Sequence, residues 1–327
     1  MKALLLVGGK GTRLRPLTIH APKSIVPIFN RPFLNYQLDL IKQVPEIDEV
    51  ILSLNYQPKR IEEVFGDGQE VGIKIRYVVE PTPLGTAGGV RYASEGVDDT
   101  LVVFNGDVLT PVDNPSAYGL VETDAEGNIR RFLEKPKPDE ITCNTINAGI
   151  YVLEPSTFDR IPRNTAWSME RSFFPSLIER GETFIAAVYR DYWIDIGTPE
   201  KYMQVHRDIM DGRYTAPPFG GQHGLAWVSP QAQVESGARL EGPLFIDAGC
   251  VVKAGARIGP HTVLGKDCRV DDDAYVSGAI IWPRSHIARE AEVRNAIVGH
   301  GCRIGGNATV VGGVLGDKTE IAEYSRI

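Results

Sequence analysis

The 327-residue chain carries 35 basic and 42 acidic side chains, a formal net charge of −7. That balance argues against a general nucleic-acid-binding protein, which usually has a basic excess. It does not exclude a phosphate site, because a few local cations and backbone N–H groups are sufficient there. Hydrophobic residues make up 43% of the chain and charged residues 24%, as is typical of a globular protein with a sizeable core.

Cysteine usage and hydropathy predict where the protein resides. The four cysteines form no CxxC pair and no small disulfide framework, which favours a reducing, cytoplasmic setting. The apolar run at residues 2–7 is interrupted by glycines too soon for a signal peptide. No stretch approaches the roughly 18 apolar residues of a membrane span. We therefore expect a cytoplasmic protein that contacts neither membrane nor nucleic acid.

Short apolar runs alternate with helical patterns over the first two hundred residues. The predicted elements, in chain order, are strand 2–7, helix 33–44, strand 49–54, helix 58–65, strand 73–79, helix 86–94 and strand 101–104. This alternation predicts an α/β fold with a Rossmann-like, mostly parallel sheet. Ligands of such sheets bind at the carboxyl ends of the strands, so we expect the site in the loops that follow strands.

One connection is shorter than this architecture requires. After Asn105-Gly106-Asp107-Val108, residues 109–115 lead straight to another strand-like stretch and include two prolines. A parallel crossover needs a dozen or more residues, usually with a helix. We therefore hypothesise that about 20 residues are absent near 108–110, since that length would supply the missing crossover.

From about residue 228 the pattern changes to a period of six. Apolar residues recur at this spacing from Val234 to Val276, with Trp282 as the next member. The period then slips by one residue to Ile287 and Val293, and slips again to Val298. Such a repeat predicts a C-terminal left-handed β-helix of hexapeptide repeats.

Three cysteines, Cys250, Cys268 and Cys302, each precede a repeat aliphatic residue by two positions. We expect small buried residues that stack between coils rather than a column of metal ligands. A Pro- and Gly-rich stretch separates the two patterns. The predicted organisation is a first domain at 1–212, a linker at 213–227 and the β-helix at 228–327.

The strongest motif is Gly8-Gly9-Lys10-Gly11-Thr12-Arg13, directly after the first predicted strand. Glycines let backbone N–H groups approach a phosphate chain closely, and the two cations add positive charge. The motif is neither a P-loop, which needs GxxxxGK[ST], nor a dinucleotide fingerprint, which needs a small residue where Leu14 stands. A plain tight turn is the structural alternative.

This opening, followed by Pro22-Lys23, resembles the sugar-1-phosphate nucleotidylyltransferase family. The resemblance covers residues 1 to about 210. The residues of its motifs are most similar to those of the mannose-1-phosphate guanylyltransferase branch. Further matching motifs occur in the family's order: Pro83-Leu84-Gly85-Thr86-Ala87-Gly88, Asn105-Gly106-Asp107, Tyr118-Gly119, Glu134-Lys135-Pro136, Asn147-Ala148-Gly149 and Trp193-Ile194-Asp195-Ile196-Gly197. The family is known to transfer a nucleotidyl group from a nucleoside triphosphate to a sugar 1-phosphate, and several branches carry a hexapeptide-repeat tail.

The resemblance implies a role for each matching position. Arg13 and Lys23 would be catalytic cations on the triphosphate. The nucleotide would be bound by Leu6, Gly8, Gly9, Gly11, Thr12, Glu80, Gly85 and Thr86. The sugar phosphate would be bound by Gly119, Glu134, Lys135 and Asn147. Asp107 and Asp195 would be the metal ligands, since two carboxylates from separate strand ends suit Mg²⁺ together with substrate phosphates. The alternatives are turn residues, a polar residue ahead of a helix, and solvated surface charges.

Glu80 carries the prediction of base specificity. Guanine presents two adjacent donors, N1–H and N2–H₂, and a carboxylate can accept both. Uracil and thymine present a single N3–H between two carbonyls, which would repel a carboxylate. Glu80 therefore favours GTP, with a solvated strand-end glutamate as the alternative.

The expected reaction is GTP plus mannose 1-phosphate giving GDP-mannose and pyrophosphate, with Mg²⁺. Two rivals stay open: a glucose-1-phosphate uridylyl- or thymidylyltransferase, and a non-catalytic regulatory subunit of such an enzyme. The tail could also be an acyltransferase, but its histidines (His261, His286 and His300) are scattered. We expect it to serve assembly, which makes a homo-oligomer the expected state.

Overall fold

The computed structural model describes residues 1–106, 108–110, 119–188, 192–222 and 224–327. The chain forms two compact units whose sequences interleave. The first comprises Met1–Lys10, Pro22–Ser24 and Leu34–Asp195, and the second comprises Gly11–Ala21, Ile25–Phe33 and Ile196–Ile327. The second unit therefore holds two early segments together with the whole C-terminal region.

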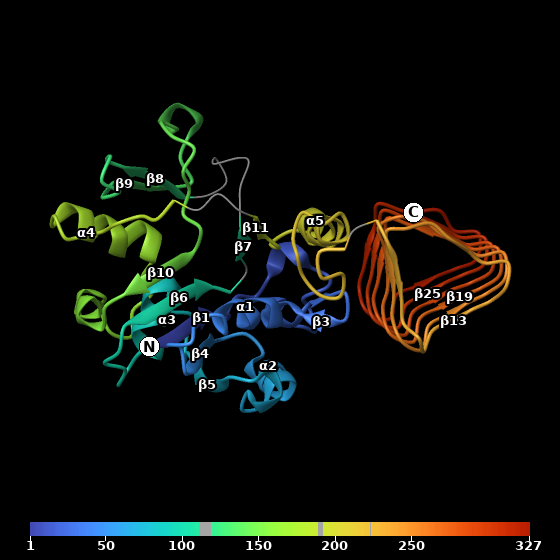
Figure 1. Cartoon of the computed structure of the whole chain (residues 1–327), viewed down its shortest axis with the longest axis horizontal. Coiled ribbons are helices and arrows are strands. Elements are labelled where there is room, and N and C mark those ends of the chain that lie inside the picture. Colours follow the sequence, from blue (N-terminus) through green and yellow to red (C-terminus); the bar gives the residue numbers. More distant parts are fainter. Residues whose placement is uncertain (107, 111–118, 189–191, 223) are drawn as a thin grey trace. The chain divides into compact units, whose positions relative to one another are not determined.

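The first unit is built on a five-stranded sheet in the order β10-β6-β1-β4-β5 (Figure 1). Four of its strands are parallel: β1 (Lys2–Leu6), β4 (Glu49–Leu54), β5 (Lys74–Val79) and β6 (Leu101–Asn105). β10 (Ile150–Leu153) lies antiparallel at one edge. The helices between the parallel strands are α1 (Phe33–Ile41), α2 (Pro58–Phe65) and α3 (Gly85–Ala93). The predicted Rossmann-like sheet is confirmed.

The central strands are apolar because both faces of the sheet are covered. Ala3, Leu4 and Leu5 of β1 are fully buried, and so are Val50 and Ile51 of β4. Continuous apolar runs of this kind are typical of parallel strands with helices on both faces.

Smaller elements complete the first unit. β8 (Gly119–Thr123) and β9 (Ile129–Glu134) form an antiparallel hairpin, and β7 (Val108–Thr110) pairs antiparallel with β11 (Trp193–Asp195). A π-helical turn at Met169–Phe173 leads into α4 (Phe174–Glu179). These elements bring residues from the second half of the unit next to strands from the first half.

The second unit ends in a left-handed β-helix of short parallel strands in three sheets (Figure 1). The first sheet contains β12 (Ala226–Val228), β15 (Leu244–Ile246), β18 (Thr262–Leu264), β21 (Ile280–Ile281), β24 (Ile297–Val298) and β27 (Val314–Leu315). The second contains β13 (Gln233–Val234), β16 (Val251–Val252), β19 (Arg269–Val270), β22 (His286–Ile287), β25 (Arg303–Ile304) and β28 (Glu320–Ile321). The third contains β14 (Arg239–Leu240), β17 (Arg257–Ile258), β20 (Tyr275–Ser277), β23 (Glu292–Arg294) and β26 (Thr309–Val311). The same unit contains the hairpin of β2 (Pro27–Ile28) and β3 (Arg31–Pro32), and α5 (Pro199–Met210).

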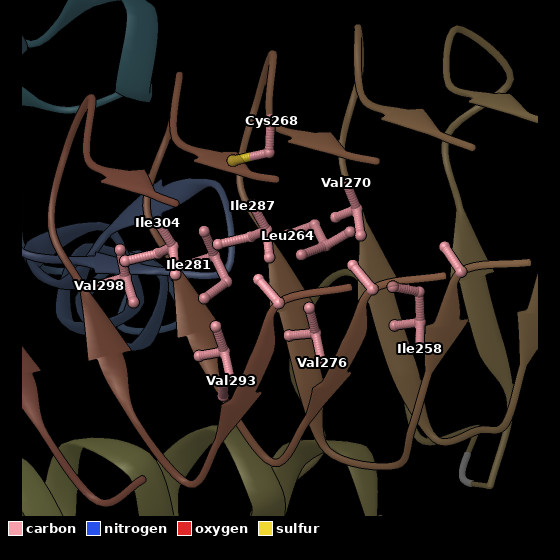
Figure 2. Close-up of a cluster of buried hydrophobic side chains, with 14 of the residues drawn as sticks. Ile258, Leu264, Cys268, Val270, Val276, Ile281, Ile287, Val293, Val298 and Ile304 are labelled. Atoms are coloured by element: carbon pink, nitrogen blue, oxygen red, sulfur yellow. The ribbon is translucent and has the colours of Figure 1, made fainter. Parts of the chain in front are cut away.

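The inward aliphatic residues stack from coil to coil and form the core shown in Figure 2. Val252 pairs with Val270, but Val270 pairs with Ile287, so the coil shortens by one residue along the β-helix. The spacing between inward residues shortens from six to five between Val276 and Ile281, one repeat earlier than predicted. Ile281, and not Trp282, pairs with Leu264 and belongs to this core. Both residues are apolar, so the sequence period alone did not distinguish them.

The three repeat cysteines are buried and stack between coils, as predicted. The Cys250 thiol donates to the carbonyl of Gly265 across 3.1 Å, and the Cys268 thiol donates to Trp282 across 3.2 Å. Cys302 donates to Gly316 across 3.1 Å. Each thiol thus satisfies a backbone carbonyl inside the β-helix. Across the part of the chain that the structure describes, we find no helix long and apolar enough to cross a membrane.

Candidate functional site

The carboxyl ends of three parallel strands meet where the glycine-rich motif begins. Gly106 N after β6 donates to Leu6 O at the end of β1 across 3.1 Å. A Cβ on Gly8 would lie 2.9 Å from the backbone nitrogen of Asn55, which follows β4, so only glycine fits there. A Cβ on Gly9 would meet nothing within 4 Å. No neighbouring protein atom therefore requires glycine at this position, and the nucleotide-binding role of Gly9 stays a prediction.

Glu80 lies directly after β5 with only 9% of its surface exposed. Its Oε1 accepts a hydrogen bond from Ser53 Oγ across 2.9 Å, and its Oε2 accepts from Leu84 N across 2.9 Å. The carboxylate therefore fixes Leu84, the residue just before α3. A carboxylate offers about four acceptor positions, so these two bonds leave capacity for a base.

The first turn of α3 is clamped by a segment far along the chain. Gly85 has φ of +69°, and a Cβ there would lie 2.8 Å from the carbonyl oxygen of Trp167. Thr86 Oγ1 donates to Glu170 Oε2 and accepts from Met169 N, both across 2.8 Å. The predicted nucleotide contact at Thr86 thus has a hydroxyl already bonded to the π-helical turn.

Three of the predicted sugar-phosphate residues lie together. Gly119 opens β8 opposite Glu134 of β9, and a Cβ on Gly119 would lie 3.1 Å from Glu134 Oε2. Asn147 N donates to Gly119 O across 2.7 Å, and Asn147 Nδ2 donates to the Tyr151 hydroxyl across 2.7 Å. Lys135 follows Glu134 with φ of +54° and an exposed side chain.

Two carboxylates, Glu134 and Glu170, and two cations, Lys135 and Arg171, set the charge around this cluster. Burial, reinforced by the nearby Glu170, raises the pKa of Glu134, while Lys135 and Arg171 act in the opposite direction. Burial, again with Glu170, also raises the pKa of Tyr151, whose hydroxyl stays protonated. The cluster therefore offers acidic acceptors and a neutral hydroxyl, which are groups that can bind sugar hydroxyls.

Lys23 and Asp195 form an ion pair inside the first unit. Lys23 Nζ lies 3.1 Å from Asp195 Oδ1, and both residues are almost fully buried, at 9% and 7% exposure. The β7–β11 pairing sets Asp195 opposite Val108. The other predicted metal ligand, Asp107, lies outside the described residues. Among the residues that are described, no three His, Cys, Asp or Glu side chains are grouped to hold a metal ion.

The remaining motif residues belong to the second unit. Gly11 adopts φ of +59° and begins a short 3₁₀ helix at Thr12–Leu14. Thr12 and Arg13 expose their side chains, whereas Leu14 is fully buried. Buried aliphatic contact thus holds the turn, and the polar side chains of the motif are directed outward.

Sequence analysis missed Ser53, Tyr151 and Glu170. Asn147, Gly149 and Tyr151 alternate at spacing two, the strand period, and this signal could have identified Tyr151. No local signal marks Ser53 or Glu170. Their roles arise from partners 27 and 84 residues away, which only the tertiary structure brings together.

Known protein families match both parts of the chain. The nucleotidyl transferase family model matches residues 2–111 and 108–212, and a model described as the GMPPB C-terminal domain matches residues 240–327. The two stretches of the first match overlap at the short connection after β6. Together they extend over nearly the whole of the predicted first domain.

Curated and solved proteins agree with these matches. A mannose-1-phosphate guanylyltransferase from Mycobacterium tuberculosis (strain ATCC 25618 / H37Rv) is 39% identical over 85% of this chain and 82% of its own length. A probable mannose-1-phosphate guanylyltransferase 1 from Oryza sativa subsp. japonica is 36% identical over 91% and 90%. The crystal structure of HddC from Yersinia pseudotuberculosis complexed with GMP-PN is 28% identical, with a TM-score of 0.52, covering 62% of this chain and 96% of that one. With the glycine-rich motif at the end of β1 and the clamped first turn of α3, these matches show that the chain belongs to the nucleotidyl transferase family.

Proposed function

We propose that this chain is an enzyme that transfers a guanylyl group from GTP to mannose 1-phosphate, giving GDP-mannose and pyrophosphate. The observation that carries the proposal is the bond between Thr86 and Glu170. It joins the first turn of α3, predicted to bind the nucleotide, to Glu170, whose charge acts on Glu134 of the predicted sugar-phosphate site. The similarity to mannose-1-phosphate guanylyltransferases supports the choice of substrates.

In the reaction, an oxygen of the sugar phosphate attacks the α-phosphorus and pyrophosphate leaves. Enzymes accelerate such transfers mainly by positioning the reactants and neutralising charge. The glycine-rich motif would hold the triphosphate, and Arg13 and Lys23 would stabilise its negative charge. Gly119, Glu134, Lys135 and Asn147 would orient the sugar phosphate.

A divalent cation fits the donor set at Asp195. This carboxylate is buried at the end of β11, and carboxylate oxygens are the ligands that Mg²⁺ prefers. We infer that Asp195 and Asp107 hold Mg²⁺, which when bound would neutralise phosphate charge. Lys23, 3.1 Å from Asp195 Oδ1, would then orient that carboxylate and contact the phosphates.

Base selection is assigned to Glu80. Ser53 and Leu84 fix its carboxylate at the end of β5, where it would accept the two donors of guanine. A uracil or thymine carbonyl would instead face a negative charge. The geometry therefore supports GTP over UTP and dTTP.

The test is pyrophosphate release with Mg²⁺, crossing GTP, UTP, dTTP and ATP against mannose and glucose 1-phosphates. We expect turnover to be highest with GTP and mannose 1-phosphate. Preference for UTP or dTTP would support the glucose-1-phosphate rival. No turnover with any pair would point to a regulatory subunit.

A pair of variants tests the base contact. Glu80→Gln should lower kcat/KM for GTP and raise it for UTP, because the amide replaces the second acceptor with a donor. Glu126→Gln is the matched control, since it makes the same change of charge at an exposed residue outside the proposed site. The control should leave kcat/KM unchanged for both nucleotides. An unchanged preference in Glu80→Gln would remove Glu80 from base selection.

We also propose that residues 1–212 form the catalytic domain, 213–227 the linker and 228–327 the β-helix domain. About 20 residues are absent from the catalytic domain near 108–110, the length a crossover would need. The alignment with the rice protein supports this, since it spans 332 positions although this chain has only 327 residues. On the edge strand β10, Ile150 and Val152 lie on one face and are 43% and 68% exposed, as expected where a covering crossover helix is missing.

We further infer a cytoplasmic homo-oligomer assembled through the β-helix. The four thiols are free, and three of them lie in the β-helix core. The last coil exposes Tyr324 at 73% and Ile327 at 53%, which a partner could cover. Light scattering coupled to gel filtration tests the assembly, and a strictly monomeric mass would contradict it.

A further inference from the structure

The segment Gly11–Ala21, which we name the signature loop, is held together by its own hydrogen bonds. Leu14 N donates to Gly11 O across 3.0 Å, Leu17 N donates to Leu14 O across 3.1 Å, and Ile19 N donates to Pro16 O across 3.2 Å. Thr18 Oγ1 closes the loop by donating to Gly11 O across 2.7 Å. The loop, which carries Arg13, is therefore expected to shift as one body when any part of it is displaced.

This loop lies in the same compact unit as the β-helix, and the last coil touches it. A Cβ built on Gly316 would lie 3.1 Å from Pro16 Cβ and 3.4 Å from Pro16 Cγ. Gly316 does not have the positive φ that would require glycine. Glycine is therefore favoured at this position because there is little space beside Pro16, and not because of its backbone conformation.

The following segment, Ile25–Phe33, is anchored in the same unit by α5 and the β-helix. The Tyr202 hydroxyl donates to Pro27 O and accepts from Trp282 Nε1, the latter across 3.0 Å. The ring of Phe29 packs against that of Phe245, with 5.2 Å between the two ring centroids. One buried tyrosine therefore links this segment to a coil of the β-helix.

A buried histidine adds a second anchor. Phe29 N donates to His206 Nε2 across 3.1 Å, and His206 Nδ1 lies 2.8 Å from Tyr202 O. Burial lowers the pKa of His206 to about 4, so the ring is neutral at physiological pH and Nε2 can accept. The two segments on either side of Pro22–Ser24 are thus both attached to elements from the C-terminal third of the chain.

We propose that the β-helix positions the signature loop for triphosphate binding, with Gly316 and the Tyr202–Trp282 pair as positioning residues. The proposal builds on the proposed function, which assigns Arg13 to the triphosphate. A side chain at Gly316 would push Pro16, and the internal bonds of the loop would carry the displacement to Arg13. The β-helix would then contribute to nucleotide affinity as well as to assembly.

Gly316→Val tests the proposal, with Gly313→Val as the matched control. The two glycines flank β27, and a Cβ on Gly313 would meet only Val310 Cγ1, at an ordinary 3.7 Å. Gly316→Val should raise KM for GTP roughly fivefold, as expected when a binding contact is weakened rather than removed. KM for mannose 1-phosphate should stay unchanged. Gly313→Val should match the parent in both constants.

Hydrogen exchange of a peptide covering residues 11–21 supplies a readout independent of turnover. Exchange should be faster in Gly316→Val than in Gly313→Val, while peptides from β1 and β4 stay the same. If Gly316→Val folds poorly, Gly316→Ala provides the smaller displacement. Equal exchange in both variants, or an equal rise of both KM values, would overturn the proposal. An inactive parent chain would refute the proposed function and leave the exchange result to decide this inference.

Discussion

At Asp195, a nearly buried carboxylate faces the ammonium of Lys23, which is also nearly buried. Two such groups are costly to remove from water unless each compensates the other. A buried pair of this kind is therefore strong support for fixed geometry and weak support for stability. The ion pair fixes the positions of both charged groups before the phosphate chain of the proposed substrate binds.

Replacing Asp195→Asn should reduce kcat roughly a hundredfold or more, the usual effect of removing one preorganised electrostatic group. Steady-state kinetics over a Mg²⁺ titration would measure the loss. Asp48→Asn is a suitable control because Asp48 is paired with Lys2 at the surface. Asp195→Asn with unchanged kcat would remove this residue from the proposed metal site.

Glu134→Gln should raise the melting temperature at neutral pH. In the folded chain the pKa of Glu134 lies above its ordinary 4.5. Between these two values the folded state holds more protons than the unfolded state, so stability falls as pH rises. The amide of the Glu134→Gln variant does not titrate, so the variant does not lose this stability as the pH rises. Calorimetry from pH 4 to 8 should show a gain that disappears toward the acid end, and a gain of equal size at every pH would contradict the assignment.

The motifs predicted several residues that the structure brings together, although their roles stay predictions. Gly119, Glu134 and Asn147 were matched through short motifs, and the β8–β9 pairing brings them together. Glu80 was correctly located at a strand end, but its bonds to Ser53 and Leu84 depend on neighbouring strands. Motifs record which residue types are needed, whereas the partners that orient them come from packing.

At the scale of elements, period and length identified the helices and strands of the first unit from β1 to β6, but gave no bounds for β7 to β11 or for α4. The predicted strand 49–54 and helix 58–65 match β4 and α2 to the residue. In the β-helix the slip was misplaced, because adjacent Ile281 and Trp282 offered two equally apolar registers. Strand pairing with Leu264 decides between them, and Trp282 is left to bond Tyr202.

Tyr202→Phe should lower the stability of the second unit. The change strips hydrogen bonds from the Pro27 carbonyl and from Trp282 Nε1, and each polar group left unsatisfied in a buried place costs about 1–3 kcal/mol. Denaturant unfolding would measure the difference. Thr18→Val is the comparison, since it removes one internal hydrogen bond of the same unit without touching Tyr202. A Tyr202→Phe variant as stable as the parent would contradict the assignment.

For the whole molecule, the prediction concerns the connection after β6. Inserting the corresponding segment of the mycobacterial relative after Thr110 should raise both melting temperature and kcat. The reason is that a restored crossover would cover Ile150 and Val152 on the edge strand, removing apolar surface from water. A scrambled insert of the same length is the control. Equal behaviour of the two inserts would contradict the proposed loss of a segment.

The interleaving of the two compact units has a consequence for synthesis on the ribosome. Pro16 and Phe29 are made early, whereas Phe245, Trp282 and Gly316, to which their segments attach, are made in the last third of the chain. Domains generally fold as units while the chain emerges, the N-terminal one first. Here the early segments of the second unit cannot complete their packing until the last coils have been made. If the β-helix positions the signature loop as proposed, we expect the nascent chain to gain activity only after the final coil is released.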